Sequence, residues 1–293
     1  MMALDAARLG FELECLDPSG PAAAAAPVSK VRQGSFMDRE AVIDLAKDHD
    51  VLTVEIEHVN VDALEEVAKE GKCAVHPAPS ALRIISDKAL QKDVMVKRGV
   101  PVVDFCVVEP NQASIEAAAA KFGGFPVMLK SRKMAYDGKG NAVVESAEGV
   151  AEALRSLGAA VAKGGVYVER WAPFKAELAC IVARNTLGEV ACYDVVETRQ
   201  ADNICRIVVV PPSFDLPEEA KAEAVRVARA AVSAVEGAGV FAVEMFWMGG
   251  SKVLYNEIAP RPHNSGHLSI EACVTSQFEQ HVRCVAGLPL GDT

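Results

Sequence analysis

The sequence predicts an α/β protein: a doubly wound parallel region at the N-terminus, then an α+β region built on an antiparallel sheet. In residues 1–77, strand-like and helix-like segments alternate, which favours a parallel sheet flanked by helices. From residue 176, long β-type segments follow one another with little helix between them, which favours antiparallel pairing. A length of 293 residues suits about two domains. We expect domains at 1–77 and 78–293, with a small α/β unit at about 103–172 inside the second.

The elements of the first region are predicted from apolar runs and helix caps. Ser35–Asp38 has the pattern of a capping box that opens a helix to about residue 49, and Asn60 caps a helix that Gly71 ends. An amphipathic helix is expected at 1–10, with strands at 11–16, 51–56 and 73–75. Because the region opens on a helix, we expect it to lack a central strand. Residues 1–77 should then either fold with a gap between strands 11–16 and 51–56 or fold poorly, while the part from about residue 80 stays ordered.

The second region begins with two helical pieces in 80–99, joined near Ser86 and Asp87. Further strands are expected near 104–108, 126–130, 141–145, 166–170, 176–185, 189–197, 204–210, 239–247 and 252–258. Further helices are expected near 114–122, 147–157, 217–235 and 277–286.

Composition and charge exclude several classes of protein. The formal net charge of −10 argues against general attraction to nucleic acid or an anionic membrane. No apolar run approaches the roughly 18 residues of a membrane helix. The eight cysteines have no zinc-type spacing and are expected to be reduced, buried thiols. Residues 1–10 do not have the pattern of a signal peptide or a transit peptide, so a cytoplasmic location is expected by default. A plastid location is the alternative if a transit peptide was lost with the N-terminus.

A cationic, glycine-containing segment is the first candidate site. The sequence KSRKMAYDGKG (130–140) places Lys130, Arg132, Lys133 and Lys139 between two predicted strands of an acidic chain. Backbone N–H groups of such a hairpin can surround phosphate oxygens while the lysines supply charge. A solvated basic turn is the alternative. The segment is not a Walker A motif, because GxxxxGK[ST] occurs nowhere in the chain.

Two glutamates on late strands are the second candidate. Glu244 and Glu257 each lie in an apolar strand, where a charge is costly unless it is paired or binds a cation. With Asn256 beside one of them, the pair predicts an Mg²⁺ site between adjacent strands. Pairing with Arg261 or a lysine is the alternative.

Two further segments carry polar side chains that could bind substrate. The loop RPHNSGH (261–267) could hold an oxyanion such as bicarbonate or phosphate, or could be a capped loop before a helix. Its His263 and His267 have no third zinc ligand. Adenine and ribose could be bound through hydrogen bonds by Glu169, the Ala172 backbone and Glu177. Surface glutamates are common, so these residues could also have no such role.

Taken together, these segments resemble one enzyme family. A cationic glycine hairpin, a later glutamate and two strand glutamates are in the order found in ATP-grasp enzymes. The stretches AYDGKGNAVV, YVERWAPFKAELACIVAR, VVETRQADNIC and NEIAPRPHNSGH resemble N5-carboxyaminoimidazole ribonucleotide synthetase, the ATPase part of phosphoribosylaminoimidazole carboxylase. LTVEIEHV, SDKALQK and TSQFEQHVRCVAGLPLGD are similar as well. The resemblance covers the whole chain and is closest to the plant and fungal form, in which a mutase-like carboxylase domain is fused.

The resemblance implies a reaction of purine synthesis. ATP would phosphorylate bicarbonate to carboxyphosphate, and the amine of aminoimidazole ribonucleotide would capture the carboxyl group. Lys88 and Lys130 would contact the ATP phosphates. The remaining roles carried over from the family are a lid hairpin (Ala135–Gly140, including Gly138), adenine and ribose contacts (Glu169, Ala172, Glu177), an Mg²⁺ site (Glu244, Glu257, with Asn256), and contacts to the ribonucleotide and bicarbonate (Tyr136, Asp137, Lys139, Arg261, His263).

The sequence also departs from the family pattern. Gln200 stands where the bacterial pattern has a histidine, and the glycine-rich loop before residue 1 and the small C-terminal domain after residue 293 are absent. The chain is therefore expected to be a fragment clipped at both ends. Two alternatives stay open: a catalytically incomplete ATP-binding or assembly module, and another ATP-grasp ligase of purine synthesis. The expected partners are a fused or separate mutase-type carboxylase domain and a second copy in a homodimer.

Overall fold

The computed structural model describes residues 1–22, 29–133, 140–158, 161, 164–201 and 204–293. Its N-terminal region holds two parallel strand pairs, β1 (Glu14–Asp17) with β2 (Lys30–Gln33) and β3 (Val51–Thr53) with β4 (Ala74–His76). Among the described residues, β1 and β3 are not paired with each other, in agreement with the expected gap between these strands. The parallel pairing itself is as predicted.

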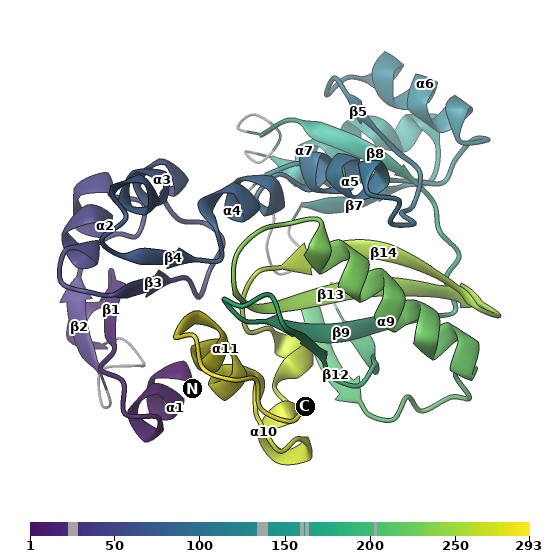
Figure 1. The fold of residues 1–293 in the computed structure, drawn as a ribbon. Coiled ribbons are helices and arrows are strands. Elements are labelled where there is room, and N and C mark those ends of the chain that lie inside the picture. The colour runs from purple at the N-terminus through teal and green to yellow at the C-terminus, as the bar shows by residue number, and fades with distance from the viewer. Residues whose placement is uncertain (23–28, 134–139, 159–160, 162–163, 202–203) are drawn as a thin grey trace.

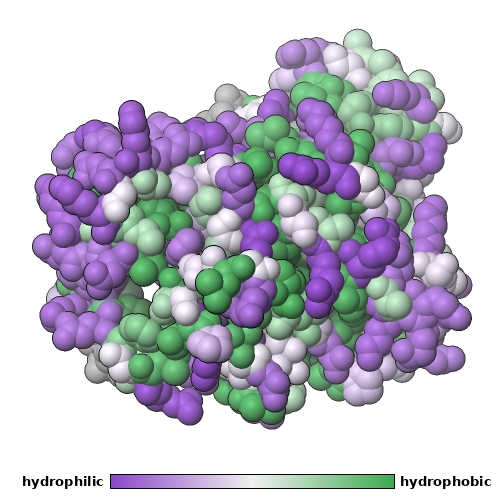
Figure 2. Space-filling view, in the orientation of Figure 1, coloured by the Kyte–Doolittle hydropathy of each residue, from purple (hydrophilic) through white to green (hydrophobic). Residues whose placement is uncertain are grey.

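Among the described residues, the helices of this region are α1 (Met2–Arg8), α2 (Arg39–Ala46) and α3 (Val61–Glu70), and α4 (Pro79–Ile85) opens the second region. The apolar faces of α2 and α3 pack on β3 and β4, whereas Figure 2 shows hydrophilic side chains over their outer faces. Asn60 caps α3 through Ala63 N–H, and Gly71 ends it at a φ of 70°, as predicted. The capping-box prediction for α2 was wrong: the Asp38 carboxylate caps the helix, and Ser35 only caps the preceding turn.

Residues 105–170 form a separate small unit. Its sheet has the order β5–β8–β6–β7, with strands β5 (Phe105–Val108), β6 (Val127–Ser131), β7 (Asn141–Val144) and β8 (Val166–Arg170), all antiparallel. Helices α6 (Gln112–Lys121) and α7 (Val150–Leu157) bury their apolar faces against one side of this sheet. The other side carries Lys130 and Glu169 and faces helix α5 (Lys88–Lys97). Figure 1 shows this unit above the central sheet.

The central sheet is antiparallel, as predicted. Its order is β12 (Ile204–Val209), β11 (Val196–Ala201), β9 (Ala176–Arg184), β13 (Gly239–Gly249) and β14 (Lys252–Ala259), and β10 (Val190–Cys192) pairs with β9. The predicted strand at 189–197 is therefore divided between β10 and β11. One face of the sheet packs on α9 (Glu218–Ser233), which contributes buried alanines and Val227.

The opposite face of the sheet packs on α11 (Gln277–Val285), the last helix of the chain, and the short helix α10 (Ser269–Ala272) precedes it. Helix α1 also packs on α11, through Met2, Ala6, Phe278 and Val282. The first and last helices thus join the N-terminal region to the central sheet (Figure 1). Among the described residues, no helix is long and apolar enough to cross a lipid bilayer.

Candidate active site

Two carboxylates face each other across strands β13 and β14. Glu244 lies directly opposite Glu257 in the antiparallel register, so both side chains are on the same side of the sheet, the side opposite α9. The register then shifts by one residue, because Met245 lies opposite Tyr255 and leaves Asn256 unmatched. Such a bulge redirects a side chain, and here Asn256 reaches Lys130 while Glu257 reaches Lys88. The expected approach of the two glutamates is confirmed.

The two carboxyl groups have opposite pKa shifts. Burial and the neighbouring Glu257 carboxylate raise the pKa of Glu244. Burial acts in the same direction on Glu257, but the ammonium group of Lys88, which contacts it directly, lowers the pKa of Glu257 overall. Two carboxyl groups this close favour either a shared proton or a cation between them.

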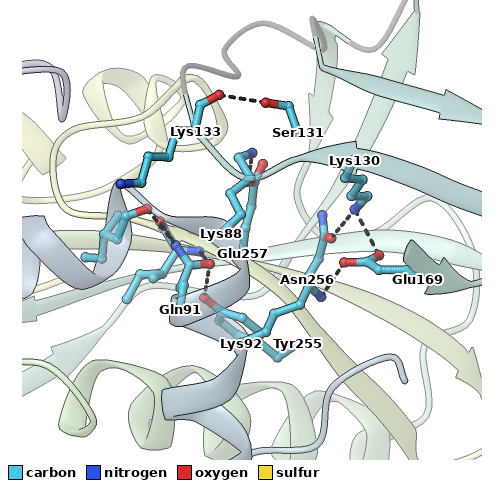
Figure 3. A network of polar contacts seen from close by, with 12 residues as sticks. Lys88, Gln91, Lys92, Lys130, Ser131, Lys133, Glu169, Tyr255, Asn256 and Glu257 are labelled. Atoms are coloured by element: carbon cyan, nitrogen blue, oxygen red, sulfur yellow. Dashed lines mark hydrogen bonds and ion pairs between the residues drawn. The ribbon is translucent and has the colours of Figure 1, made fainter. Parts of the chain in front are cut away.

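A second ion cluster lies beside the first, at the end of strand β8. The Glu169 carboxylate, only 3% exposed, contacts Lys92 Nζ at 2.9 Å and Lys130 Nζ at 3.0 Å. Lys130 and Glu169 are diagonal neighbours in the register of β6 and β8. Lys92 is on α5, one turn after Lys88, so a single helix face delivers a lysine to each carboxylate cluster. Figure 3 shows Lys88 beside Glu257 and Lys130 beside Glu169, whereas Lys133 points away from both carboxylates.

We call this combined cluster the strand site. Its charged members are Lys88, Lys92, Lys130, Glu169, Glu244 and Glu257.

Of the residues expected to contact adenine and ribose, Glu177 lies close enough to Lys130 and Glu257 of the strand site for their charges to act on it. Glu177 is half-buried on β9; burial raises its pKa, and a hydrogen bond with Gln200 of β11 opposes that shift. Gln200 therefore lies beside the glutamate that we expect to bind ribose. Ala172 is in the irregular segment between β8 and β9, next to the exposed Trp171, and its carbonyl accepts from Phe174 N–H. The Glu169 side chain is engaged by the two lysines, so a contact from this residue to adenine would have to use its backbone.

The polar loop after β14 forms a second group, which we call the loop site: Glu57, Arg261 and His263. Arg261 Nε donates to Glu57 Oε2 at 2.7 Å, which ties the loop to the N-terminal region. His263 is held by Gln277, whose amide bonds both the backbone N–H and the carbonyl of this residue. Burial and the charge of Arg261 lower the pKa of His263 to about 4. Since Ser265 N–H donates to Nδ1, the proton of the neutral ring is on Nε2.

Several sequence-predicted residues are not described. Ala135, Tyr136, Asp137, Gly138 and Lys139 lie outside the described residues, so their roles remain predictions. Gly140 follows at a φ of 116°, a conformation that favours glycine, and its carbonyl accepts from Ser131 N–H. The sequence places Arg132 among the four cations of the candidate anion-binding segment. In the structure its guanidinium instead makes a bidentate ion pair with Asp87, the cap of α5, and so is not available to a ligand.

Sequence reasoning missed three residues of these sites. Lys92 could have been found from its i, i+4 spacing to Lys88 in a predicted helix. Gln91 is buried and accepts from Tyr255 O–H at 2.6 Å, which fixes α5 to β14. Glu57, the partner of Arg261, is 204 positions away in sequence, and no local pattern signals it.

The residues present suit a divalent cation. Two facing glutamates offer carboxylate oxygens to a cation, and the Asn256 amide oxygen, in contact with Lys130 at 3.4 Å, is a third oxygen donor beside them. Among the described residues there is no group of three or more His, Cys, Asp or Glu side chains placed to bind a metal. An oxygen-rich site with few protein ligands is typical of Mg²⁺ that also binds substrate phosphates.

Comparison with known proteins agrees with this geometry. Residues 93–278 match the ATP-grasp domain, and residues 1–86 match the preATP-grasp domain of ribonucleotide synthetases. The chain is therefore an ATP-grasp protein, as the fold class predicted. Within that class it belongs to the N5-carboxyaminoimidazole ribonucleotide synthetase family, as the relatives described next show.

Two curated relatives are phosphoribosylaminoimidazole carboxylases. The protein from Ogataea methanolica is 49% identical over 257 residues, covering 88% of this chain and 46% of the relative. The protein from Vigna aconitifolia, named as chloroplastic, is 42% identical over 294 residues, covering 100% of this chain and 51% of the relative. The chain thus spans about half the length of these relatives.

Two solved structures come from Aspergillus clavatus. Carboxyaminoimidazole ribonucleotide synthase complexed with ATP has a TM-score of 0.92 and 40% identity, covering 100% of this chain and 75% of that one. N5-carboxyaminoimidazole synthase in complex with ADP and 5-aminoimidazole ribonucleotide has a TM-score of 0.88 and 38% identity, covering 99% and 74%. The prediction of the family from sequence is confirmed.

Proposed function

We propose that the chain uses ATP to carboxylate aminoimidazole ribonucleotide with bicarbonate, giving N5-carboxyaminoimidazole ribonucleotide, ADP and phosphate. The observation that carries this proposal is the convergence of three lysines and three glutamates at the strand site, on a fold shared with a synthase that was solved with ATP. The loop site, with an arginine and a neutral histidine, would hold the second substrate.

The reaction divides between the two sites. At the strand site, Lys88 and Lys130 neutralise the triphosphate, and the Glu177 carboxylate accepts from ribose hydroxyls. A bicarbonate oxygen attacks the γ-phosphorus, so that the bond from this phosphorus to ADP breaks and carboxyphosphate forms. The exocyclic amine then attacks the carboxyl carbon and phosphate leaves with the bridging oxygen. Positioning and charge neutralisation supply most of the catalysis in such phosphoryl transfers.

At the loop site, the Arg261 guanidinium is oriented by Glu57 and can bind an oxyanion. His263 is neutral at pH 7 and carries its proton on Nε2, so it can donate to a substrate oxygen without adding charge. Tyr136, Asp137 and Lys139 are proposed to complete this site around the ribonucleotide.

Mg²⁺ would be held by Glu244, Glu257 and Asn256. When bound it would offset negative charge on the transferring phosphoryl group. The chain's own contribution is to hold the two carboxylates on one side of β13 and β14, with the Asn256 amide fixed by its contact with Lys130.

The test is to measure ADP release with ATP, Mg²⁺ and bicarbonate, with and without aminoimidazole ribonucleotide. We expect release that depends on the ribonucleotide. With ¹⁸O-labelled bicarbonate, the released phosphate should carry one ¹⁸O atom, because the bridging oxygen comes from bicarbonate. ATP binding without stimulated release would contradict the proposed reaction and leave an ATP-binding module.

The proposal extends to two partners. The product would pass to a mutase-type carboxylase domain, fused or separate, and the chain would form a homodimer. The relatives named phosphoribosylaminoimidazole carboxylase are about twice as long as this chain, which leaves room for such a domain in them. Light scattering of the purified chain at several concentrations tests the dimer.

A further inference from the structure

We propose that Lys92, a lysine too deeply buried to reach a nucleotide, sets the charge of the ATP site by sharing Glu169 with Lys130. The inference rests on the proposed function, because it assumes that Lys130 binds a phosphate. Lys92 would then be a positioning residue: it occupies one oxygen of Glu169, so that the ammonium group of Lys130 is only partly neutralised and stays available to the triphosphate.

The first observation is the burial of Lys92. The residue is 1% exposed. Its Nζ atom lies 5.9 Å from the centroid of the Tyr255 ring and 2.9 Å from Glu169 Oε1. Among the described residues, neither Lys92 Nζ nor Glu169 Oε1 has a well-directed hydrogen bond, so the contact between them is chiefly one of charge. By contrast, the Lys130 side chain is 11% exposed and also contacts the Asn256 amide oxygen at 3.4 Å. Lys130 is therefore at the border of the cluster, and Lys92 is inside it.

The second observation is the balance of charge. Lys88 is matched by Glu257, which it contacts directly. The ions around Glu169 are two lysines, Lys92 and Lys130, and one carboxylate, which together carry one positive charge. Without Lys92, Lys130 and Glu169 would form a neutral pair. Lys92 thus accounts for the excess positive charge next to the residue expected to bind phosphate.

The third observation is that packing does not require this charge. Burying an ammonium group is unfavourable, and well-packed apolar residues often replace buried ion pairs without loss of stability. The neighbouring Gln91 already fixes α5 to β14 through Tyr255 O–H and the Ile258 backbone. The Glu169 carboxylate is surrounded by Lys92, Lys130 and the Tyr167 hydroxyl, with Glu257 and Tyr255 nearby. A role in binding an anion explains why two of these neighbours are cations.

The experiment compares the binding of ATP with that of adenosine, which has no phosphate, by calorimetry on the full chain. Lys92→Met should weaken ATP binding by about ten- to thirtyfold, the effect of one unit charge acting over roughly 8–12 Å at an effective dielectric of about 20. Adenosine binding should not change. Lys97→Met is the matched control on the same helix: Lys97 is 71% exposed and pairs with Asp93, and its loss should leave both affinities unchanged.

A charge-compensated variant separates electrostatics from damage to the fold. Lys92→Met combined with Glu169→Gln removes one charge of each sign and should return ATP affinity to within about threefold of wild type. If Lys92 only supports the structure, the double variant will bind more weakly than either single one, and adenosine will be lost together with ATP. That result overturns the inference, as does unchanged ATP affinity in Lys92→Met. If Lys92→Met does not fold, the ATP affinity of the double variant is compared directly with that of wild type, and an affinity outside the threefold range overturns the inference. Failure of the wild type to bind ATP would overturn the proposed function itself.

Discussion

The strand site and the loop site are assembled in different ways. In the strand site every charged residue is on a helix or strand. Strand register fixes two of the pairs, Glu244 opposite Glu257 and Lys130 diagonal to Glu169. Helix α5 adds Lys88 and Lys92 to them. In the loop site, Arg261 meets Glu57 across 204 positions. The nearby contact of Thr53 with His281 spans 228 positions. The comparison teaches that the strand site forms when α5 packs against its two sheets, whereas the loop site forms when the N-terminal region docks.

The charge balance of the two sites differs as well. The strand site gathers six charged side chains that are largely matched with one another, so its potential depends on each member. The loop site has a single ion pair and a histidine kept neutral by burial. Changes in the strand site should therefore act on ATP and turnover, and changes in the loop site should act on the second substrate.

The largest effect is expected from Glu257→Gln. The amide cannot balance Lys88 or bind a cation as a carboxylate does, so turnover with Mg-ATP should fall by about 10³-fold or more. The fold should remain intact, because the amide keeps the volume of the side chain. ADP release and thermal unfolding are the measurements. A variant with turnover within tenfold of wild type would show that the pair does not hold the metal.

Lys130→Ala should have the next largest effect. It removes the charge at the border of the strand site and should weaken ATP binding by about ten- to a hundredfold. Lys139→Ala is the comparison from the hairpin: it should chiefly lower ribonucleotide-stimulated turnover. Calorimetry with ATP and steady-state ADP release separate the two effects. Equal loss of ATP affinity in both variants would show that the roles of these lysines are not divided in this way.

How far the sequence predicts these sites follows from their construction. Glu244, Glu257 and Lys130 were predictable because a charge in an apolar strand is conspicuous in the sequence. Lys92 is less conspicuous, since lysines are common in helices and only the tertiary packing of α5 buries this one. The bulge at Asn256 and the pairing of Arg132 with Asp87 depend on three-dimensional contacts that no periodicity encodes. Glu57 was beyond local reasoning because its partner comes from another region.

Glu57→Gln tests whether the loop site acts on the second substrate alone. Burial raises the pKa of Glu57, but Arg261 lowers it overall, so the carboxylate is charged and orients the guanidinium. Without that charge, the KM for the ribonucleotide or for bicarbonate should rise about tenfold, as for loss of one charged hydrogen bond. ATP affinity should stay within twofold. The exposed neighbour Glu55 provides the control, Glu55→Gln, which should change neither value. A comparable loss of ATP affinity in Glu57→Gln would mean that the two sites are not separable.

The smallest effect expected concerns the junction that supports the loop site. His281 is fully buried, with Nδ1 accepting from Val240 N–H and Nε2 bonded to Thr53 Oγ1 at 2.8 Å. Burial, with a smaller contribution from His76, lowers the pKa of His281 to about 4, whereas an unfolded histidine titrates near about 6.5. Between these values the unfolded chain binds more protons than the folded one. The stabilisation is therefore complete above about pH 6.5 and is lost as the pH falls towards 4.

Each pH unit within that window should cost about 1.4 kcal/mol of unfolding free energy from this group. His281→Asn removes the titrating ring. The unfolding free energy should therefore fall less steeply from pH 6.5 to 5, by up to about 1.4 kcal/mol per pH unit, the slope that one proton contributes. This holds even if the variant is less stable at every pH. Denaturant unfolding at pH 5, 5.5, 6, 6.5 and 7.5 measures this slope. The exposed His267, changed to Asn, is the control and should leave the slope as in wild type. An unchanged slope in His281→Asn would mean that the buried ring does not resist protonation, and that the junction between Thr53 and α11 tolerates a charge.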